Sequence, residues 1–377
     1  MKGDQLTDAE RQDWLRLIRS ENVGPVTFRR VLERYGSAAE ALRQLPDMAR
    51  RGGRSKPLRI CSKAEAEREL KAIRKLNARL VCWMEPDYPT PLGMTEDAPP
   101  VLTVLGHAHL LTKPAVGIVG ARNGSTNGCR LARDIAAGLG RGGYTVVSGL
   151  ARGIDTAAHE GSLETGTVAV VAGGVDHIYP PENEALQHQI AAIGAVVSEQ
   201  PPGNVPTAQH FPRRNRIIAG IALGLVVVEA ASRSGTLITA RLATEQGREV
   251  MAVPGSPLDP RNAGSNGLLK QGATLVESAA DVMAAVESQH RLHLEERLDM
   301  HYTFQSAQAP SATAELAGEA GDRARADVLS RLGHDPVPVD VLIRDCHLSA
   351  ASVHVLLTEL ELAGRIERFG ANVTRID

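Results

Sequence analysis

The segment from His210 to Arg216 carries the residues best suited to contact a polyanion. Arginine offers phosphate a planar fork of donors and a permanent charge, and a neighbouring aromatic ring can stack on a nucleic-acid base. Two plainer explanations are a solvated basic helix end for the arginines and a core position for the ring. The residues that predict contact with phosphates and bases are Phe211, Arg213, Arg214, Asn215 and Arg216.

A glycine-rich loop at 117–125 follows a short apolar run and precedes a helical pattern. Glycines such as Gly120 let the backbone approach an anion, and the amides and dipole at a helix start favour negative charge. Arg122 adds a guanidinium, and Ser125 can cap the helix. The loop has neither the G-x-G-x-x-G pattern of dinucleotide-binding folds nor a Walker lysine. It therefore predicts a phosphate contact or, alternatively, a tight turn with a structural arginine.

A second loop of the same type begins at Ser148-Gly149 and carries Arg152. Asp155 and His159 follow one helical turn apart, so they share a helix face. They could form an acid–base pair, but no third ligand accompanies them and we do not expect a metal site. We expect Asp155 to cap the helix and His159 to be bonded into the loop framework, and we predict no catalytic residue.

A third loop, Ser234-Gly235-Thr236, starts another expected helix and offers an amide-rich nest for an anion. Ligands of parallel α/β sheets bind at the carboxyl ends of the strands, so the three loops should lie along one edge, with Lys270 extending it. One small phosphate does not need so many separated cations, whereas a strand of phosphates does. The predicted row of guanidinium groups comprises Arg122, Arg152, Arg213, Arg214 and Arg216.

Short runs rich in Val, Ile and Ala alternate with helical patterns between residues 115 and 288. Continuous apolar runs are typical of strands covered on both faces, and their alternation with helices predicts a doubly wound, mostly parallel α/β sheet. The expected strands are 115–121, 145–148, 167–172, 195–198, 223–229, 249–253 and 274–276. The expected helices are 125–140, 153–163, 182–193, 213–221, 236–246 and 266–271.

The part of the chain in front of this sheet has a different pattern. Residues 1–85 predict an all-α domain. Its turn Val23-Gly24-Pro25 between two helices is similar to a helix-hairpin-helix or sterile-alpha-motif (SAM) unit, or is a plain turn that uses the freedom of glycine. The proline-rich stretch 85–114 predicts an extended connector into a sheet domain of 86–288.

The part behind the sheet predicts a linker and a small domain. Residues 289–322 are polar and rich in small residues, as in linkers. Residues 323–377 predict two helices and a hairpin, the order of a winged helix. Its second helix carries Glu359 and Glu361, which favours contact with protein over contact with DNA.

The composition indicates that any anion site is local. The 377 residues suffice for two or three domains, but the formal net charge is −2 and aromatic residues make up 3%. There is thus no overall polybasic character. Residues 1–100 carry a charge balance of +4 and residues 286–377 one of −6, which favours the front two thirds for nucleic-acid contact.

Cysteine usage and hydropathy argue for a reduced, cytoplasmic setting. The four cysteines stand far apart and form no C-x-x-C pair, so neither a zinc site nor a disulfide framework is expected. Met1 to Trp14 is polar and does not predict a signal peptide. The longest apolar run, 217–228, is too short for a membrane span.

Several motifs together resemble the DNA-processing protein A family, known as DprA or Smf. The resemblance covers residues 86–288, with its motifs in order and at matching spacing. The family often has serine where this chain has Ala121, so one hydroxyl that could reach phosphate is absent from the first loop. The motifs include Gly120-Ala121-Arg122, the runs 148–155 and 211–220, the run 234–240, and Val253-Pro254-Gly255.

The resemblance implies a Rossmann-like domain that binds single-stranded DNA without sequence preference and has no catalytic activity, cofactor or metal. It implies a homodimer that protects incoming strands during natural transformation and loads the RecA recombinase. It also implies that the DNA groove is formed by Gly120, Arg122 and Ser125 and by the segment 211–216.

Two other functions remain open at this point. The loops also resemble lysine-decarboxylase-like (LOG) phosphoribohydrolases, which cleave nucleoside monophosphates, but Thr239 stands where those enzymes carry the glutamate that does the chemistry. The winged helix would suit a transcription factor, although the acidic C-terminal third argues against that role.

Overall fold

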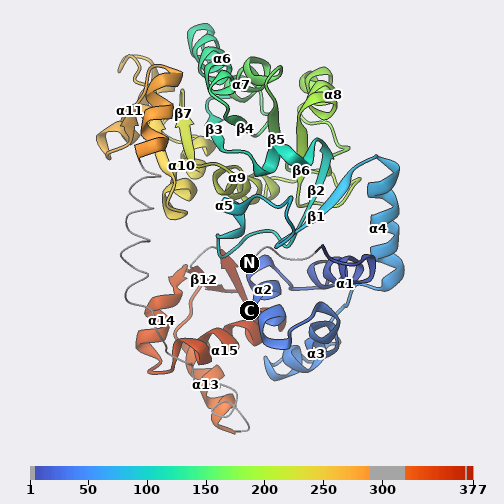
Figure 1. Cartoon of the computed structure of the whole chain (residues 1–377). Helices are drawn as coiled ribbons and strands as arrows, with labels where there is room; N and C mark the ends of the chain where they lie inside the picture. The colour runs from blue at the N-terminus through green and yellow to red at the C-terminus, as the bar shows by residue number, and fades with distance from the viewer. Residues whose placement is uncertain (1–4, 289–318, 370–371, 377) are drawn as a thin grey trace. The chain divides into compact units, whose positions relative to one another are not determined.

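A computed structural model describes residues 5–288, 319–369 and 372–376. The chain divides into two compact units (Figure 1). The first contains the sheet domain from Glu69 onward, and the second combines Leu6–Arg68 with the C-terminal domain. Segments from opposite ends of the chain thus belong to one unit.

The first unit is built on a sheet that has nine strands within the described residues, in the order β1-β2-β6-β5-β4-β3-β7-β8-β9. From β6 to β9 all neighbouring strands are parallel, while β2 runs antiparallel to β1 and β6. The chain winds outward from β3 to β6 and then returns to β7 beside β3, which makes a topological switch point. The strands are β1 (Arg79–Cys82), β2 (Val101–Gly106), β3 (Ala115–Val119), β4 (Thr145–Ser148), β5 (Thr167–Val170), β6 (Ala195–Ser198), β7 (Gly224–Val227), β8 (Glu249–Ala252) and β9 (Thr274–Leu275).

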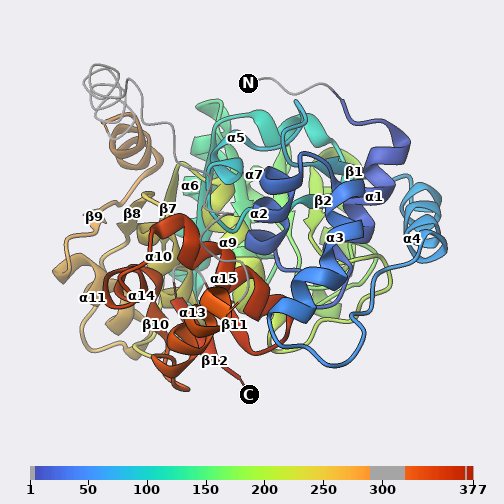
Figure 2. The ribbon, with the colours of Figure 1, turned by 90° about the horizontal axis from the view of Figure 1, so that it is seen from below.

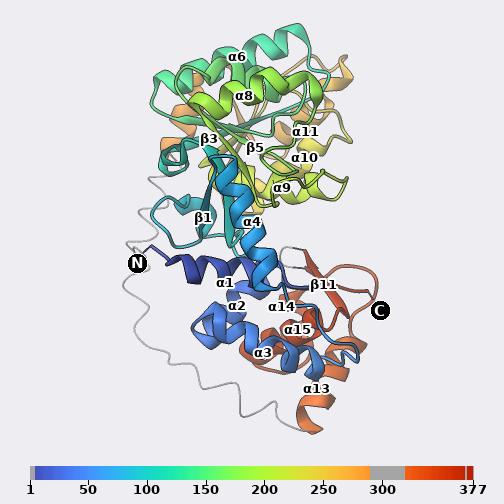
Figure 3. The same ribbon diagram turned by 90° about the vertical axis from the view of Figure 1, so that its right-hand side faces the viewer.

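Helices cover both faces of this sheet (Figures 1 and 3). One face is covered by α6, α7 and α8, and the other by α9 and α10. Every residue of β3 to β7 is buried, which explains their continuous apolar runs. The predicted doubly wound, mostly parallel sheet is therefore confirmed. The helical segments are α6 (Thr126–Arg141), α7 (Ile154–Ser162), η2 (Pro181–Asn183), α8 (Glu184–Ile193), α9 (His210–Ile221), α10 (Gly235–Glu245), η3 (Pro260–Asn262) and α11 (Ala263–Lys270).

The expectation of an extended connector at 85–114 is wrong. This stretch holds α5 (Thr90–Gly93), β2 and the 3-10 helix η1 (Ala108–Thr112), and β2 pairs with β6 inside the sheet. The prolines of this stretch all stand outside β2. An interior antiparallel strand flanked by prolines is hard to distinguish from a linker by composition, because its partner β6 lies about ninety residues away. Its other partner, β1, was itself not predicted.

The second unit begins with the predicted N-terminal helices. Thr7 caps the first through a capping box with Glu10, and Pro25 opens the second. Their core is apolar, and the rings of Trp14 and Phe28 meet edge to face with centroids 5.0 Å apart. The N-terminal helices of this unit are α1 (Asp8–Ile18), α2 (Pro25–Tyr35) and α3 (Ala38–Arg51), and α4 (Lys63–Lys75) crosses into the first unit at Glu69.

The C-terminal domain is the predicted winged helix. Its core is formed by buried residues of three helices and a small three-stranded sheet (Figure 2). The hairpin of β11 and β12 is the wing, and β10 pairs with β12. The elements are α13 (Glu319–Ser330), β10 (Val337–Pro338), α14 (Val339–Asp345), α15 (Ala350–Leu362), β11 (Ile366–Phe369) and β12 (Asn372–Arg375).

Among the described helices, none is by itself long and apolar enough to cross a bilayer. Of these, only α14 and α15 together have that length and apolarity, and the chain bends by 117° between them.

Candidate nucleic-acid interface

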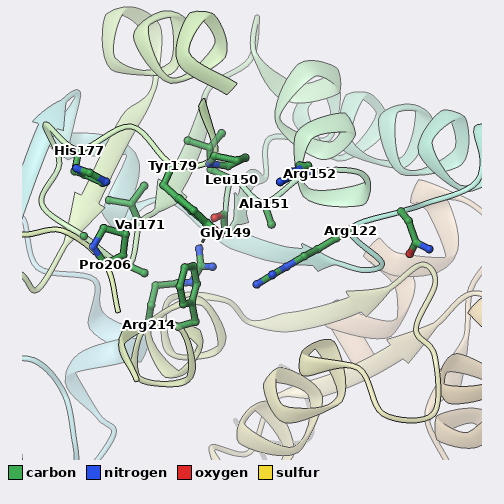
Figure 4. Close-up of a pocket in the computed structure, with 15 residues that line it drawn as sticks. Arg122, Gly149, Leu150, Ala151, Arg152, Val171, His177, Tyr179, Pro206 and Arg214 are labelled. Atoms are coloured by element: carbon green, nitrogen blue, oxygen red, sulfur yellow. Dashed lines mark hydrogen bonds between the residues drawn. The ribbon is translucent and has the colours of Figure 1, made fainter. Parts of the chain in front are cut away.

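A pocket of about 290 Å³ opens where β3, β4 and β5 end, beside the switch point of the sheet (Figure 4). The loop after β3 contributes Arg122, the loop after β4 runs from Gly149 to Arg152, and the loop after β5 contributes residues 171–173. The first turn of α9 closes the pocket with Phe211 and Arg214. The structure therefore brings together the first two predicted loops and the front of the arginine run.

The exposed rim of the pocket combines cations with aromatic rings. The guanidinium carbon of Arg122 lies 5.6 Å from the centroid of the Phe211 ring, and the rings of Phe211 and Tyr179 are 5.4 Å apart. Arg122 and Arg152 are both exposed, and Arg152 faces Glu182 at 3.5 Å. A guanidinium stacked on a ring keeps its N–H groups available at its edge. This rim can therefore offer donors to phosphate and a flat surface to a base.

The buried floor of the pocket is held by Arg214. This side chain is 6% exposed, and its Nη1 donates to the carbonyl oxygens of Gly149 and Val170. A Cβ at Gly149 would lie 2.3 Å from the guanidinium, so glycine is required for the two to fit. Burial lowers the pKa of Arg214 to about 10, while Asp155 opposes the change. Arg214 is thus a buried cation at neutral pH, held at the floor beside Asp155.

Asp155 and His159 form the framework beneath that floor. Asp155 accepts the amides of Gly149 at 3.2 Å and Ala151 at 3.4 Å. Burial raises its pKa, and the charge of Arg214 opposes the rise. The Thr167 hydroxyl donates to Val146, so His159 donates from Nδ1 to Thr167 at 2.8 Å. Burial lowers the pKa of His159 to about 3, so this imidazole is neutral. His159 thus bonds to Thr167 at the start of β5 and not into the loop, so the expected bond to the loop framework is wrong. The expectation that Asp155 caps α7 is wrong as well, because Asp155 bonds amides of the preceding loop and Gly153 precedes α7 without a side-chain cap.

The predicted single row of guanidiniums is wrong for Arg216. This residue is 8% exposed, and its guanidinium forms an ion pair with Glu199 and donates to the carbonyl oxygen of Asp97. Successive residues of a helix point about 100° apart, so Arg216 leaves the pocket that Arg214 enters. Arg213 is exposed on α9, and Asn215 accepts a hydrogen bond from Nε of Arg214 at 3.2 Å.

The predicted amide nest at the first loop is already occupied by a carboxylate. Ser125 donates its amide at 2.8 Å and its hydroxyl at 2.6 Å to Glu229, which follows β7. A Cβ at Gly128 would meet the same carboxylate. The anion at the start of α6 is therefore a side chain of the protein itself. Gly120 serves packing, because a Cβ there would lie 2.6 Å from Ile154.

The remaining predicted residues do not line the pocket. Ser148 is buried and donates its hydroxyl to Ile118 at 2.6 Å. In the third loop, Ser234 accepts the amide of Thr236, whose hydroxyl donates to Gly120 at 3.0 Å, while Gly235 is exposed at the start of α10. Lys270 is exposed at the end of α11. The third loop thus braces the first from the neighbouring strand.

Two important residues were missed from the site by sequence reasoning. Tyr179, from the loop after β5, shares the rim with Phe211, and Glu229 occupies the start of α6. An aromatic in a loop of a chain with 3% aromatic residues was a usable signal for Tyr179. Nothing local marks Glu229, because its partner Ser125 is 104 residues away.

The residues that the structure describes contain no group of three or more His, Cys, Asp or Glu side chains placed to hold a metal ion. Thr239, at the position of the phosphoribohydrolase glutamate, is 2% exposed and lies inside α10.

Comparison with known proteins shows similarity along the whole length. The chain is 31% identical to Protein Smf of Synechocystis over 96% of this chain and 98% of that protein. It is 46% identical to the DNA processing protein DprA of Streptococcus pneumoniae over 53% of this chain and 71% of that protein.

Solved structures show the same similarity. The X-ray structure of the Streptococcus pneumoniae DprA superposes with a TM-score of 0.62 and 36% identity, covering 74% of this chain and 98% of that one. A structure of the Helicobacter pylori protein, described as showing its single-stranded DNA binding mode, gives a TM-score of 0.51 and 26% identity, covering 56% and 96%.

Three family matches divide the chain in the same order as its folded parts. Residues 8–72 match the DprA-like N-terminal HHH domain, and residues 307–372 match the DprA winged helix domain. Residues 79–287, more than half of the chain, match DNA recombination-mediator protein A. The chain therefore belongs to the DNA recombination-mediator protein A family, the DprA/Smf family of DNA-processing proteins.

Proposed function

We propose that this protein binds single-stranded DNA without sequence preference through the pocket at the ends of β3, β4 and β5. The observation that carries the proposal is the rim, in which Arg122 stacks on Phe211 at 5.6 Å and Phe211 meets Tyr179 at 5.4 Å. A splayed base can stack on such rings, and every base has a face to stack with. The relative from Helicobacter pylori, whose structure is described by its single-stranded DNA binding mode, supports this assignment.

The electrostatic arrangement supports a strand over a single nucleotide. Arg122 and Arg152 place exposed positive charges on two successive loops of the pocket. Exposed cations along a groove can follow several phosphates, and the ions released from DNA make the affinity depend on salt. Duplex DNA presents its bases stacked and paired, so it cannot use the aromatic rim without opening.

Membership in the family supports a proposal for the wider role. We propose that the bound strand is DNA taken up during natural transformation, that the protein acts as a homodimer, and that it delivers the strand to the RecA recombinase. We propose that it acts by binding alone. The described residues that line the pocket include no Asp or Glu, and Asp155 lies below the floor and bonds loop amides.

A titration tests the proposal directly. Fluorescence anisotropy would compare single-stranded and duplex oligonucleotides of equal length at several salt concentrations, for the natural chain and for Arg122→Ala. We expect the single strand to bind more tightly, and Arg122→Ala to weaken binding to all sequences and to flatten the log–log salt slope by about 0.7. Arg241→Ala is the matched control, because Arg241 is an exposed arginine of α10 outside the pocket. An unchanged slope in Arg122→Ala would contradict the proposed site.

A further inference from the structure

The helix α15 occupies the position of the recognition helix in the winged-helix fold, yet its C-terminal half is buried. A recognition helix ordinarily presents one face to the major groove of duplex DNA. Here each residue from Leu356 to Leu360 is buried, as is Leu362, and these positions run around the whole circumference of the helix. The winged-helix core accounts for one side of α15, so another part of the protein must cover the rest.

The cover is provided by the N-terminal helices of the same unit. Glu359 is 4% exposed and accepts Nε of Arg51, at the end of α3, at 2.8 Å, as well as Nε of Arg325 from α13 at 2.9 Å. The loss of either guanidinium would leave the buried carboxylate with incomplete charge compensation, which is destabilising. Figures 2 and 3 show α15 beside α3, in agreement with this ion pair.

A second carboxylate engages the turn between α1 and α2. Glu361 accepts the hydroxyl of Thr27 and pairs with Arg368 of the wing at 3.5 Å. It also lies 3.7 Å from the place where a Cβ of Gly24 would be. The side chain of Asn22 donates to the carbonyl oxygen of Leu362 at 3.2 Å. The predicted helix-hairpin-helix turn is therefore in contact with the last turn of α15.

The backbones also approach closely at the end of α3. A Cβ at Gly52 would lie 2.0 Å from the carbonyl oxygen of Glu359 and 2.9 Å from the Cβ of Ala363. Gly52 has φ −67° and ψ −2°, a conformation open to any residue. The glycine is needed for this approach and not for the fold of α3 itself.

We propose that α15 is a docking helix for the N-terminal helices of its own chain, so that the two terminal domains act as one unit and α15 is not available to duplex DNA. The charge of α15 fits this role, because its thirteen residues include Glu359 and Glu361 and no lysine or arginine. Phosphate contact by a helix requires cations or donors. The partner of this winged helix is thus the protein that carries it.

Hydrogen exchange of the full chain tests the proposal. In Gly52→Ala, the added methyl should push α15 away, and we expect amides of 356–362 and of α2 to exchange at least about tenfold faster than in the natural chain. Exchange in α6 should not change. Gly267→Ala is the control, because a Cβ at that helical glycine meets no atom within 4 Å. Unchanged exchange of α15 in Gly52→Ala would overturn the proposal.

Two further arms keep the result interpretable. If exchange of α1 also becomes faster in Gly52→Ala, the N-terminal domain has unfolded. The double variant Glu359→Gln with Glu361→Gln then decides, because it removes the charges with little change of volume. In this variant we expect faster exchange of α15 while α1 stays protected. Glu33→Gln with Asp340→Asn removes the same charge at exposed positions and should change nothing. Adding duplex DNA to the natural chain should leave exchange of α15 unaltered; protection of α15 by the duplex would overturn the proposal.

Discussion

The arginines of α9 and the arginines on the rim of the pocket use the same side chain in two different ways.

 Arg214 and Arg216 are 6% and 8% exposed, and each is bonded to carbonyl or carboxylate oxygens of the protein. Arg122 and Arg152 are exposed on loops after β3 and β4. The comparison teaches that a basic cluster in a sequence contains two populations: cations that hold the loops in place and cations that can meet a ligand.

The largest effect is expected from replacing Arg216, one of the buried arginines, and it should be an effect on stability. Arg216→Ala should lower the free energy of unfolding by about 3–5 kcal/mol, because it removes a buried guanidinium together with its ion pair to Glu199 and its bond to the Asp97 carbonyl. Urea denaturation measures this loss. Arg241→Ala, which breaks an exposed pair on α10, should cost under about 1 kcal/mol. If Arg216→Ala were stable and instead flattened the salt slope of DNA binding, the division into interior and rim arginines would be wrong.

The opposite behaviour is expected on the rim. Phe211→Ala should weaken single-stranded DNA binding by about 1–3 kcal/mol through loss of stacking, with a smaller effect on stability because the ring is only partly buried. Phe211→Tyr keeps a ring and should retain most of the affinity. Anisotropy titrations give the affinities, and natural affinity in Phe211→Ala would remove the ring from the site.

The stability of the protein should depend on pH through His159, which lies beneath the floor of the pocket. The folded pKa of His159 is about 3 against an ordinary 6.5, so between these values the unfolded chain binds the extra proton. Stability from this residue is complete above about pH 6.5 and is lost as the pH falls, by up to about 1.4 kcal/mol per pH unit. Denaturation from pH 7 to 5 should therefore show a shallower slope in His159→Gln than in the natural chain. Identical slopes would show that His159 does not stay neutral.

The smallest effect on DNA binding is expected from replacing Glu182, the carboxylate beside the rim arginine Arg152. Glu182 faces Arg152 at 3.5 Å, and both are exposed. Glu182→Gln should tighten DNA binding by no more than about 0.5 kcal/mol, since an exposed pair is weak. The difference should vanish in high salt. Weaker binding in Glu182→Gln would indicate that the carboxylate orients Arg152 instead of competing for it.

The sequence by itself determined the architecture of the sheet domain and of the winged helix. Strands buried on both faces must be apolar throughout, and helices between them must carry periodic apolar positions, so β4 and β6 were predicted with their observed ends. The loops after β3 and β4 and the ring of Phe211 were also predicted as parts of one site, because parallel strands end at a common edge.

Only the tertiary structure decided what each charged group does. Arg216 turns inward because Asp97, 119 residues away, and Glu199 provide its partners, and the start of α6 is filled by Glu229 from another strand. The strand β2 is recognisable through its pairing with β6. Pairings of this kind join positions far apart in the chain, and local pattern carries no information about them, because burial and charge compensation are settled only when the elements pack.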